Sequence, residues 1–256
     1  MKDFDIVDYV KGKTIALVGP ASYMQDSGFG QEIEKHDIVV RINRGIESTE
    51  QYPKDLGQRT DIYYSCLIER AQQTGILNVE DLLSRNIRCI VAPPHSDMKG
   101  IARERVFHSL VDREKVKKIN EKIPVYIVDC DFHTVLAKVV DCKPNTGFLA
   151  IYDILRLKPE KLSIYGFSFY LDGFIKGQKS GVENEKNCSE SEFATLAFNS
   201  KRHVQKNMWN YAKSTLLNTP NDATNGVEIN LDPVLSQILN LPELSRELFA
   251  KSVKLS

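Results

Sequence analysis

The alternation of short apolar runs with amphipathic segments constrains the fold of this chain more than any other feature. Seven runs have the length and composition of buried strands, at 13–19, 37–43, 61–66, 88–93, 124–129, 161–167 and 226–231. Helical periodicity separates or follows them, at 28–35, 78–85, 99–119, 147–157, 193–217 and 232–252. Apolar strands that alternate with helices are typical of a mainly parallel sheet with helices on both faces. We therefore predict one α/β domain over residues 1–256.

Charge and composition argue against several functional classes. The 34 basic and 34 acidic residues cancel, so no overall field favours nucleic acid or an anionic membrane, and a phosphate would have to be bound locally.

The first apolar stretch is interrupted by charged residues, Asp3, Asp5, Asp8 and Lys11. It therefore forms neither a signal-peptide core nor a membrane span. We expect a cytoplasmic protein. The five cysteines lack the paired spacing of zinc sites and are expected to be reduced thiols, largely in the core.

Segments that follow strands are the candidate site, because ligands of open α/β sheets bind at the carboxyl ends of the strands. After the first strand, Gly19, Pro20 and Ser22 belong to a tight turn that could bring amides and a hydroxyl to a phosphate, although a simple turn remains the alternative. After the second strand, Arg41 and Asn43 are expected to project into the cleft. Otherwise Arg41 would pair with a surface acid and Asn43 would cap a turn.

A second anion site is predicted at the start of the helix near 147–157. Asn145 or Thr146 is a good N-cap, and Gly147 allows a ligand to approach closely, so the free amides of this helix could hold a phosphate without a metal. The alternative is an ordinary capped helix that packs through residues such as Phe148 and Leu149.

His203 is the candidate general base. It comes at the start of a helical stretch whose apolar positions, among them Val204 and Met208, would leave the imidazole open to the cleft. An ordinary histidine pKa near ~6.5 suits proton abstraction at neutral pH. Most single histidines are structural or surface residues, which is the alternative.

The segment 171–192 is polar, contains glycine and lacks periodicity. A stretch of this length inside a compact domain is usually a functional lid or a disordered loop, and its place after a strand favours a mobile lid.

Three segments, in order, resemble a known enzyme family. "IALVGPASYMQDSGFGQEIEKHDIVVRIN" resembles the large motif of the eukaryotic-type sialyltransferases, glycosyltransferase family 29, with a G-x-G-Q-E-I segment and an R-x-N close. "PNTGFLAIYDILRLKPEKLSIYGFSFY" resembles its small motif, and "DLGQRTDIYY" is similar to its G-x-K/R-T segment. "YGFSFY" is also similar to a motif of the bacterial sialyltransferases of family 42. The resemblance covers most of 13–212.

This resemblance implies a single Rossmann-like domain, a GT-A-like variant of the sialyltransferase type. It implies an inverting glycosyltransferase without metal or other cofactor, which moves sialic acid or a related 2-keto sugar from a CMP-sugar donor to a glycan acceptor. His203 would be the general base. The residues that would contact the donor are Gly19, Pro20, Ser22, Asn43, Asn145, Thr146, Gly147, Gly166, Phe167 and Ser168.

The chain departs from the family pattern in three respects. No His- or Tyr-rich short motif is visible between Tyr170 and His203, which leaves the family's usual phosphate partner unidentified. Pro20 stands where the large motif has asparagine, and Met208 stands where the family has a glutamate five residues after the histidine. Two alternatives therefore stay open, a transferase that uses another nucleotide sugar and a nucleotide-binding relative without activity. The lack of a visible membrane anchor and stem is expected of a bacterial, viral or other non-Golgi homologue.

Overall fold

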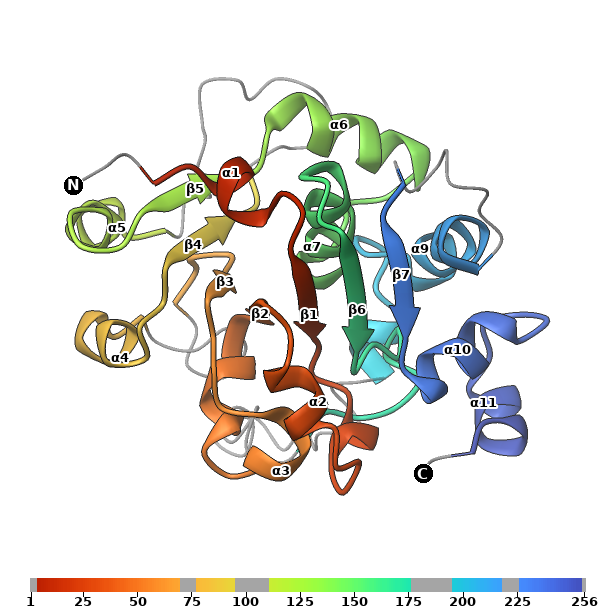
Figure 1. The fold of residues 1–256 in the computed structure, drawn as a ribbon. Coiled ribbons are helices and arrows are strands. Elements are labelled where there is room, and N and C mark those ends of the chain that lie inside the picture. The colour runs from red at the N-terminus through yellow and green to blue at the C-terminus, as the bar shows by residue number, and fades with distance from the viewer. Residues whose placement is uncertain (1–3, 70–76, 95–110, 176–194, 218–225, 255–256) are drawn as a thin grey trace.

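Among the residues that the structure describes, the chain forms one seven-stranded parallel sheet. The computed structural model describes residues 4–69, 77–94, 111–175, 195–217 and 226–254. The sheet has the order β5-β4-β3-β2-β1-β6-β7, and every neighbouring pair is parallel (Figure 1). The strands are β1 (Thr14–Val18), β2 (Ile38–Ile42), β3 (Ile62–Tyr64), β4 (Cys89–Ala92), β5 (Val125–Ile127), β6 (Lys161–Tyr165) and β7 (Glu228–Leu231). Each predicted strand range contains the observed strand, so this part of the prediction is confirmed.

The helices agree with the sequence pattern in part. They are α1 (Ile6–Val10), α2 (Gly30–Glu34), α3 (Pro53–Leu56), α4 (Val79–Ser84), α5 (Arg113–Asn120), α6 (Cys130–Val139), α7 (Thr146–Arg156), α9 (Gln205–Ala212), α10 (Pro233–Asn240) and α11 (Arg246–Ser252). The sequence did not lead us to expect α1, α3 or α6. The first half of the helix predicted at 99–119 lies outside the described residues.

Two predicted helices are each broken into shorter pieces. In the stretch 193–217, residues 195–198 are helical, the chain then leaves the helix, and α9 begins only at Gln205 before a π-helical turn at Lys213–Leu217. In the stretch 232–252, α10 ends before Pro242, which has no N–H to continue a helix. Hydrophobic periodicity alone predicted one continuous helix in each stretch, whereas the backbone forms separate helical pieces.

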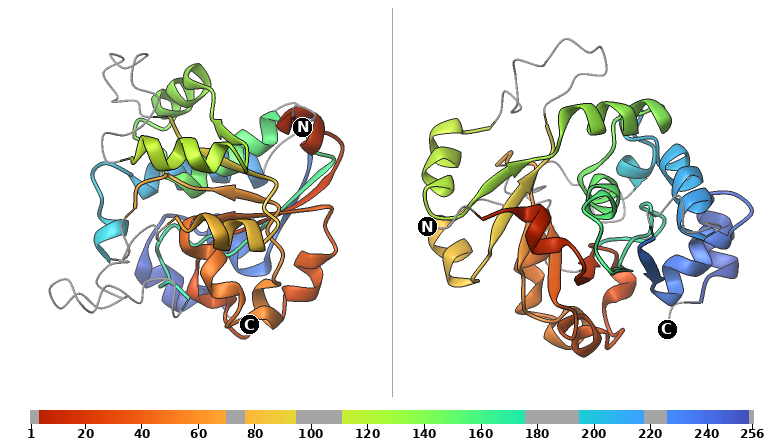
Figure 2. Two further views of the ribbon diagram at one scale, coloured as in Figure 1. Left: turned by 90° about the vertical axis from the view of Figure 1, so that its left-hand side faces the viewer. Right: turned by 45° about the horizontal axis from the view of Figure 1, so that its top comes forward.

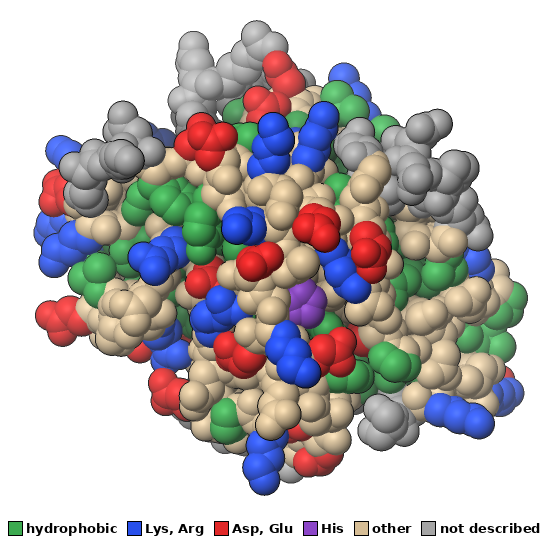
Figure 3. All heavy atoms as spheres, in the orientation of Figure 1, with side chains coloured by type: hydrophobic (Ala, Val, Ile, Leu, Met, Phe, Trp, Pro, Cys, Tyr) green, Lys and Arg blue, Asp and Glu red, His purple; other side chains and the backbone are tan. Residues whose placement is uncertain are grey.

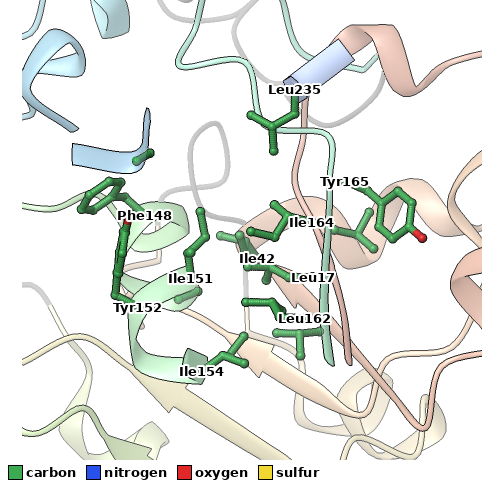
Figure 4. Close-up of a cluster of buried hydrophobic side chains, with 14 of the residues drawn as sticks. Leu17, Ile42, Phe148, Ile151, Tyr152, Ile154, Leu162, Ile164, Tyr165 and Leu235 are labelled. Carbon is green, nitrogen blue, oxygen red and sulfur yellow. The ribbon is translucent and has the colours of Figure 1, made fainter. Parts of the chain in front are cut away.

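Helices cover both faces of the sheet (Figure 2). Successive residues of a strand point to opposite faces. Figure 4 shows Ile154 of α7 directed toward Leu162 of β6 and Ile151 toward Ile42 of β2, whereas Tyr165 points the other way. On that other face the Tyr165 hydroxyl donates to Glu32 Oε1 of α2 at 2.7 Å. The expected arrangement of a central sheet between helices is therefore confirmed.

The largest apolar cluster lies where α7 packs on the central strands. Leu149 and Ile154 of α7 and Leu17 of β1 are fully buried, and burial of each such side chain stabilises the fold by about 1.5–3 kcal/mol. Asp153 is a buried carboxylate within this helix. It accepts a hydrogen bond from the Tyr64 hydroxyl at 2.8 Å and pairs with Arg156 at 2.8 Å, so its burial is compensated.

The cysteines in the described part of the chain are free thiols, as expected. Cys89 and Cys142 are buried, and burial raises the pKa of both thiols. Cys188 lies outside the described residues.

The molecular surface shows no single-sign patch on the face drawn in Figure 3, where basic and acidic side chains are interspersed. Within the described ranges, no helix combines the length and the apolar character needed to cross a bilayer.

The strand order places a crevice beside β1. From β1 the chain adds β2 to β5 toward one edge, and it then returns to add β6 and β7 on the other side of β1. In open α/β sheets the ligand binds at such a reversal, outside the carboxyl ends of the strands. The residues that follow β1, β2 and β6 meet there.

Candidate active site

A cavity of about 520 Å³ opens at this reversal. Its walls come from the segments after β1, β2 and β6, from the start of α7, and from residues 196–205 before α9. A cavity of this size can enclose most of a small-molecule ligand.

Nine of the eleven predicted site residues line the cavity, and two do not. Those that do are Pro20, Asn43, Asn145, Thr146, Gly147, Gly166, Phe167, Ser168 and His203. Gly19 and Ser22 are not among the lining residues. Ser22 starts a short 3₁₀ helix, and its N–H donates to Gly173 O at 3.0 Å. Met208 is fully buried and does not line the cavity either.

The turn after β1 is closed by its neighbour β6. Gly19 N–H donates to Tyr165 O at 2.7 Å, and Ala21 N–H donates to Gly166 O at 3.0 Å. A Cβ on Gly19 would lie 2.4 Å from Gly166 O, so only glycine permits the two backbones to approach this closely. These amides already have acceptors. They are therefore not free to bind a phosphate, which the sequence analysis expected of this turn.

Asn43 presents its side chain to the cavity from an unusual backbone conformation. Its φ of 45° lies in the left-handed region, which non-glycine residues adopt rarely and most often as asparagine. Asn43 Oδ1 accepts the N–H of Cys66 at 3.3 Å, which leaves the side-chain NH₂ group as a donor for a ligand.

Arg41 does not project into the cleft, so that expectation is wrong. Its side chain is 1% exposed, and its guanidinium donates to Leu56 O at 2.6 Å and Arg59 O at 3.0 Å. Burial lowers its pKa to about 10. It does not pair with a surface acid either, because backbone carbonyls and the Thr60 hydroxyl hold it. Arg41 fixes the loop before β3 rather than a ligand.

The start of α7 has the predicted cap. Asn145 Oδ1 accepts Phe148 N–H at 2.8 Å, and the first helical bond is Leu149 N–H to Asn145 O. The N–H groups of Thr146 and Gly147 therefore have no acceptor within the helix, as in the first turn of any helix. A Cβ on Gly147 would lie 2.9 Å from the Phe167 ring, so glycine lets this ring close the cavity floor.

A hydrogen bond from one ring nitrogen fixes the position and the tautomer of His203. It lies two residues before α9, and its Nδ1 is 2.7 Å from Lys143 O. A carbonyl oxygen can only accept, so Nδ1 carries the proton and Nε2 of the neutral ring keeps its lone pair. Burial lowers the pKa of His203, the hydrogen bond to Lys143 O partly opposes this, and the nearby Arg202 and Lys143 charges lower the pKa further. At neutral pH the ring is therefore a neutral acceptor of protons.

Several polar residues of the cavity were not singled out from the sequence. Among them are Arg44, Lys143, Arg202 and Gln205. Gln205 is 2% exposed, and its Nε2 donates to His203 O at 2.7 Å. Lys143 directly precedes the P-N-T-G segment, which is the one signal that could have drawn attention to it. The others depend on how residues 200–205 fold back against 143.

Of the predicted lid, only 171–175 are described. Ser22 N–H donates to Gly173 O, and Ile175 N–H donates to Pro20 O at 3.0 Å. Phe174 and Ile175 are buried. These five residues are thus part of the domain, and 176–192 lie outside the described residues.

A parallel α/β sheet with a cavity at its reversal point, lined by a helix N-terminus and polar strand ends, defines a Rossmann-like fold with a candidate ligand site. The family can be stated as well. The model of glycosyltransferase family 29 (sialyltransferase) matches residues 8–173. The chain therefore belongs to this family, a family of glycosyltransferases.

Curated relatives agree with this family. The mouse CMP-N-acetylneuraminate-beta-galactosamide-alpha-2,3-sialyltransferase 2 is 26% identical over 168 residues, which cover 59% of this chain and 42% of that protein. The pig sialyltransferase 1 of the same description is 25% identical over 170 residues, 62% of this chain and 45% of that protein. The chain thus spans less than half the length of the curated relatives it matches.

Solved structures share the fold. CstII from Campylobacter jejuni, in complex with the substrate analogue CMP-3FNeuAc, superposes with a TM-score of 0.56 at 13% identity, over 91% of this chain and 88% of that one. A mammalian sialyltransferase gives a TM-score of 0.50 at 15% identity, over 89% and 73%. The expected Rossmann-like sialyltransferase fold is confirmed.

Proposed function

We propose that this chain transfers sialic acid, or a related 2-keto sugar, from a CMP-sugar donor to a hydroxyl of a glycan. The observation that carries the proposal is the cavity beside β1, in which the amide end of α7 and His203 share one wall. Membership of family 29 supports it, as do relatives whose names specify a CMP-N-acetylneuraminate donor.

In this reaction the acceptor hydroxyl oxygen attacks the anomeric carbon of the sugar. His203 Nε2 takes the hydroxyl proton, the bond from that carbon to the phosphate oxygen breaks, and its electron pair leaves with CMP. A single displacement of this kind inverts the anomeric configuration. The departing phosphate gains charge, which the free amides of Thr146 and Gly147 stabilise without a metal.

The remaining donor contacts follow from the cavity walls. The side-chain NH₂ of Asn43 is a donor at the exit of β2, and Gly166, Phe167 and Ser168 line the wall after β6. Pro20 also lines the cavity. Gly19 and Ser22 act from behind it, because they hold the segments after β1 and β6 together.

The test is release of CMP by the purified protein with CMP-sialic acid and a glycan acceptor, in the presence of EDTA. Replacement His203→Ala should lower turnover by about 10²- to 10⁴-fold, the usual contribution of a general base. His36→Ala is the control, since the His36 ring contacts Ser163 between α2 and β6, outside the cavity. Equal activity of the His203 variant and the parent would refute the base assignment, and loss of transfer in EDTA would refute metal independence.

Nucleotide preference separates the proposal from its alternatives. A ligand present at 100-fold its Kd stabilises a protein by about 2.7 kcal/mol, so CMP should raise the melting temperature where UDP and GDP do not. Selective stabilisation by UDP or GDP would indicate another sugar donor. Stabilisation by CMP without consumption of the donor would indicate a nucleotide-binding protein without transfer activity.

A further inference from the structure

The cavity is positively charged although the chain is neutral overall. The described residues that line it include three cations, Arg44, Lys143 and Arg202, and no aspartate or glutamate. The whole chain has 34 residues of each sign. Basic side chains without acidic neighbours in a partly enclosed site attract an anion.

The three cations are not equally available to that anion. Arg44 is already paired, because its Nη2 lies 2.6 Å and its Nε 2.7 Å from Glu47 Oε2. Arg202 is exposed to solvent, where a charge is worth little. Lys143 is half-buried, and within the described part of the chain no ion pair involves it. Burial lowers its pKa, and the nearby Arg202 lowers it further, so a bound anion would relieve an unfavourable charge.

The backbone of Lys143 is fixed against the segment that carries the base. Its N–H donates to Arg202 O at 3.1 Å, and its carbonyl accepts from His203 Nδ1 at 2.7 Å. The next residue is the buried Pro144, and Asn145 then caps α7. The ammonium group therefore extends from a rigid point, three residues before the free N–H of Thr146, and no carboxylate is among the described residues of the cavity lining.

We propose that Lys143 binds the phosphate of the donor together with the N-terminal amides of α7, and so holds the leaving group beside His203. This inference rests on the proposed function. The donor has two anionic groups, a phosphate and a sugar carboxylate. The phosphate is the one that the helix amides favour, and Lys143 directly adjoins that helix end.

A cation at this point would act on the reaction as well as on binding. Negative charge grows on the phosphate oxygen as its bond to the sugar breaks, so the attraction to Lys143 is stronger in the transition state than in the bound donor. Loss of the ammonium should therefore raise the KM for the donor and lower kcat.

The test compares CMP with cytidine, which lacks the phosphate, by calorimetric titration of the parent, Lys143→Met and Lys206→Met. Lys206 is an exposed lysine of α9 outside the cavity and serves as the matched control. Lys143→Met should weaken CMP binding about tenfold, the scale of one charge-assisted hydrogen bond, and leave cytidine binding unchanged. Lys143→Arg should restore part of the CMP affinity, and the melting temperature of each free variant checks its fold.

Each other outcome has a definite meaning. Equal CMP affinity of Lys143→Met and the parent overturns the inference while the proposed function stands. If Lys143→Met binds CMP normally but binds the 3-fluoro analogue of CMP-sialic acid weakly, the lysine holds the carboxylate and the phosphate assignment is wrong. An equal loss for CMP and cytidine shows general damage to the cavity, which also contradicts the inference. A parent that binds neither ligand overturns the proposed function itself.

Discussion

His203 owes its proposed role to a single backbone oxygen 60 residues earlier in the chain. The bond from Nδ1 to Lys143 O fixes which nitrogen is free, and the same neighbour brings a positive charge that lowers the pKa of the ring. Lys143 thus sets the tautomer of the ring, whereas burial is the main cause of its lowered pKa.

The activity should therefore fall only in mildly acidic solution. The pKa of folded His203 is below its ordinary 6.5, because burial disfavours the charged ring. The base is neutral at pH 7, and we expect kcat/KM to drop as pH falls through that lowered pKa. Since the folded state binds its proton less readily than the unfolded state, acid also removes stability in this range. Lys143→Met should move the acid limb of the kcat/KM profile to higher pH. A limb that stays in place would show that Lys143 does not influence the ring.

Gly166 offers a test of the close approach of β1 and β6. It has a φ of +73°, and a Cβ there would lie 2.6 Å from Gly19 O. Gly28 has a similar φ of +71° with nothing within 4 Å, so it is a matched control. Gly28→Ala should cost about 1–2 kcal/mol of unfolding free energy for the left-handed backbone alone. Gly166→Ala should cost clearly more in urea unfolding, because backbone must also move. Equal costs would mean that the two turns are not tightly packed.

The residues foreseen from the sequence are those whose role is local. Asn145 caps its own helix, and Gly147 lies in the first turn of that helix. Arg41 was misjudged because its guanidinium donates to carbonyls of a loop 15–18 residues later. Lys143 and Gln205 escaped notice since only the folded chain brings 143 against 202–205. Local rules cannot supply such long-range pairs.

At the scale of elements, strands were easier to foresee than helices. The buried strands are short apolar runs with polar ends, whereas α6 is a half-exposed helix that starts after its cap Asp129. The long helix predicted at 193–217 failed because Ser200 Oγ accepts the N–H of His203 and the chain pairs with Lys143 instead. That break is what places the imidazole in the cavity wall.

The C-terminal helix α11 connects the two ends of the segment proposed as a lid. Arg246 donates through Nη2 to Tyr170 O at 3.0 Å and through Nη1 to Thr195 Oγ1 at 2.5 Å. These two residues flank 171–194. Arg246 thereby holds the residues on both sides of this segment close to α11.

Deletion of 177–190 tests the lid. The described anchor 171–175 would be kept, since Ile175 is fully buried and pairs with Pro20. We expect a folded protein with a melting temperature close to that of the parent and a strongly reduced rate of transfer, because closure of a lid excludes water from the reaction. Replacing 177–190 with a glycine-serine linker of equal length is the control for chain length. Full turnover of the deletion variant would contradict the lid.

For the whole molecule, the sequence predicted the class and the family but not the cavity's composition. Strand-like and helix-like hydrophobic periods alternate along the sequence, which is enough to predict a parallel α/β sheet. The three motif segments in their order are enough to predict family 29, whose model matches residues 8–173. His203, the proposed base, and its polar neighbours Arg202 and Gln205 lie after residue 173. Their position follows from the return of the chain along α7 and α9, which no local pattern encodes.

The sheet also predicts the behaviour of a shortened chain. A fragment that ends at Leu157 would have β1 to β5 but neither β6 nor the wall after it. Its β1 edge, with the buried Ile15 and Leu17, would be exposed, and open apolar edges aggregate. We expect light scattering to report aggregation and titration to detect no CMP binding. A monomeric fragment that binds CMP would show that β6 is dispensable for the site.

The late arrival of β6 has a consequence for how the protein is made. Residues 161–165 leave the ribosome long after Thr14–Val18, to which they must pair. At the usual speed of synthesis this delay is on the order of ten seconds, during which β1, whose residues from Ile15 to Val18 are buried in the folded protein, has one side unpaired. A chaperone that binds extended apolar segments would find its preferred target there, so the yield of active protein in a cell should depend on such help more than its folded stability would suggest.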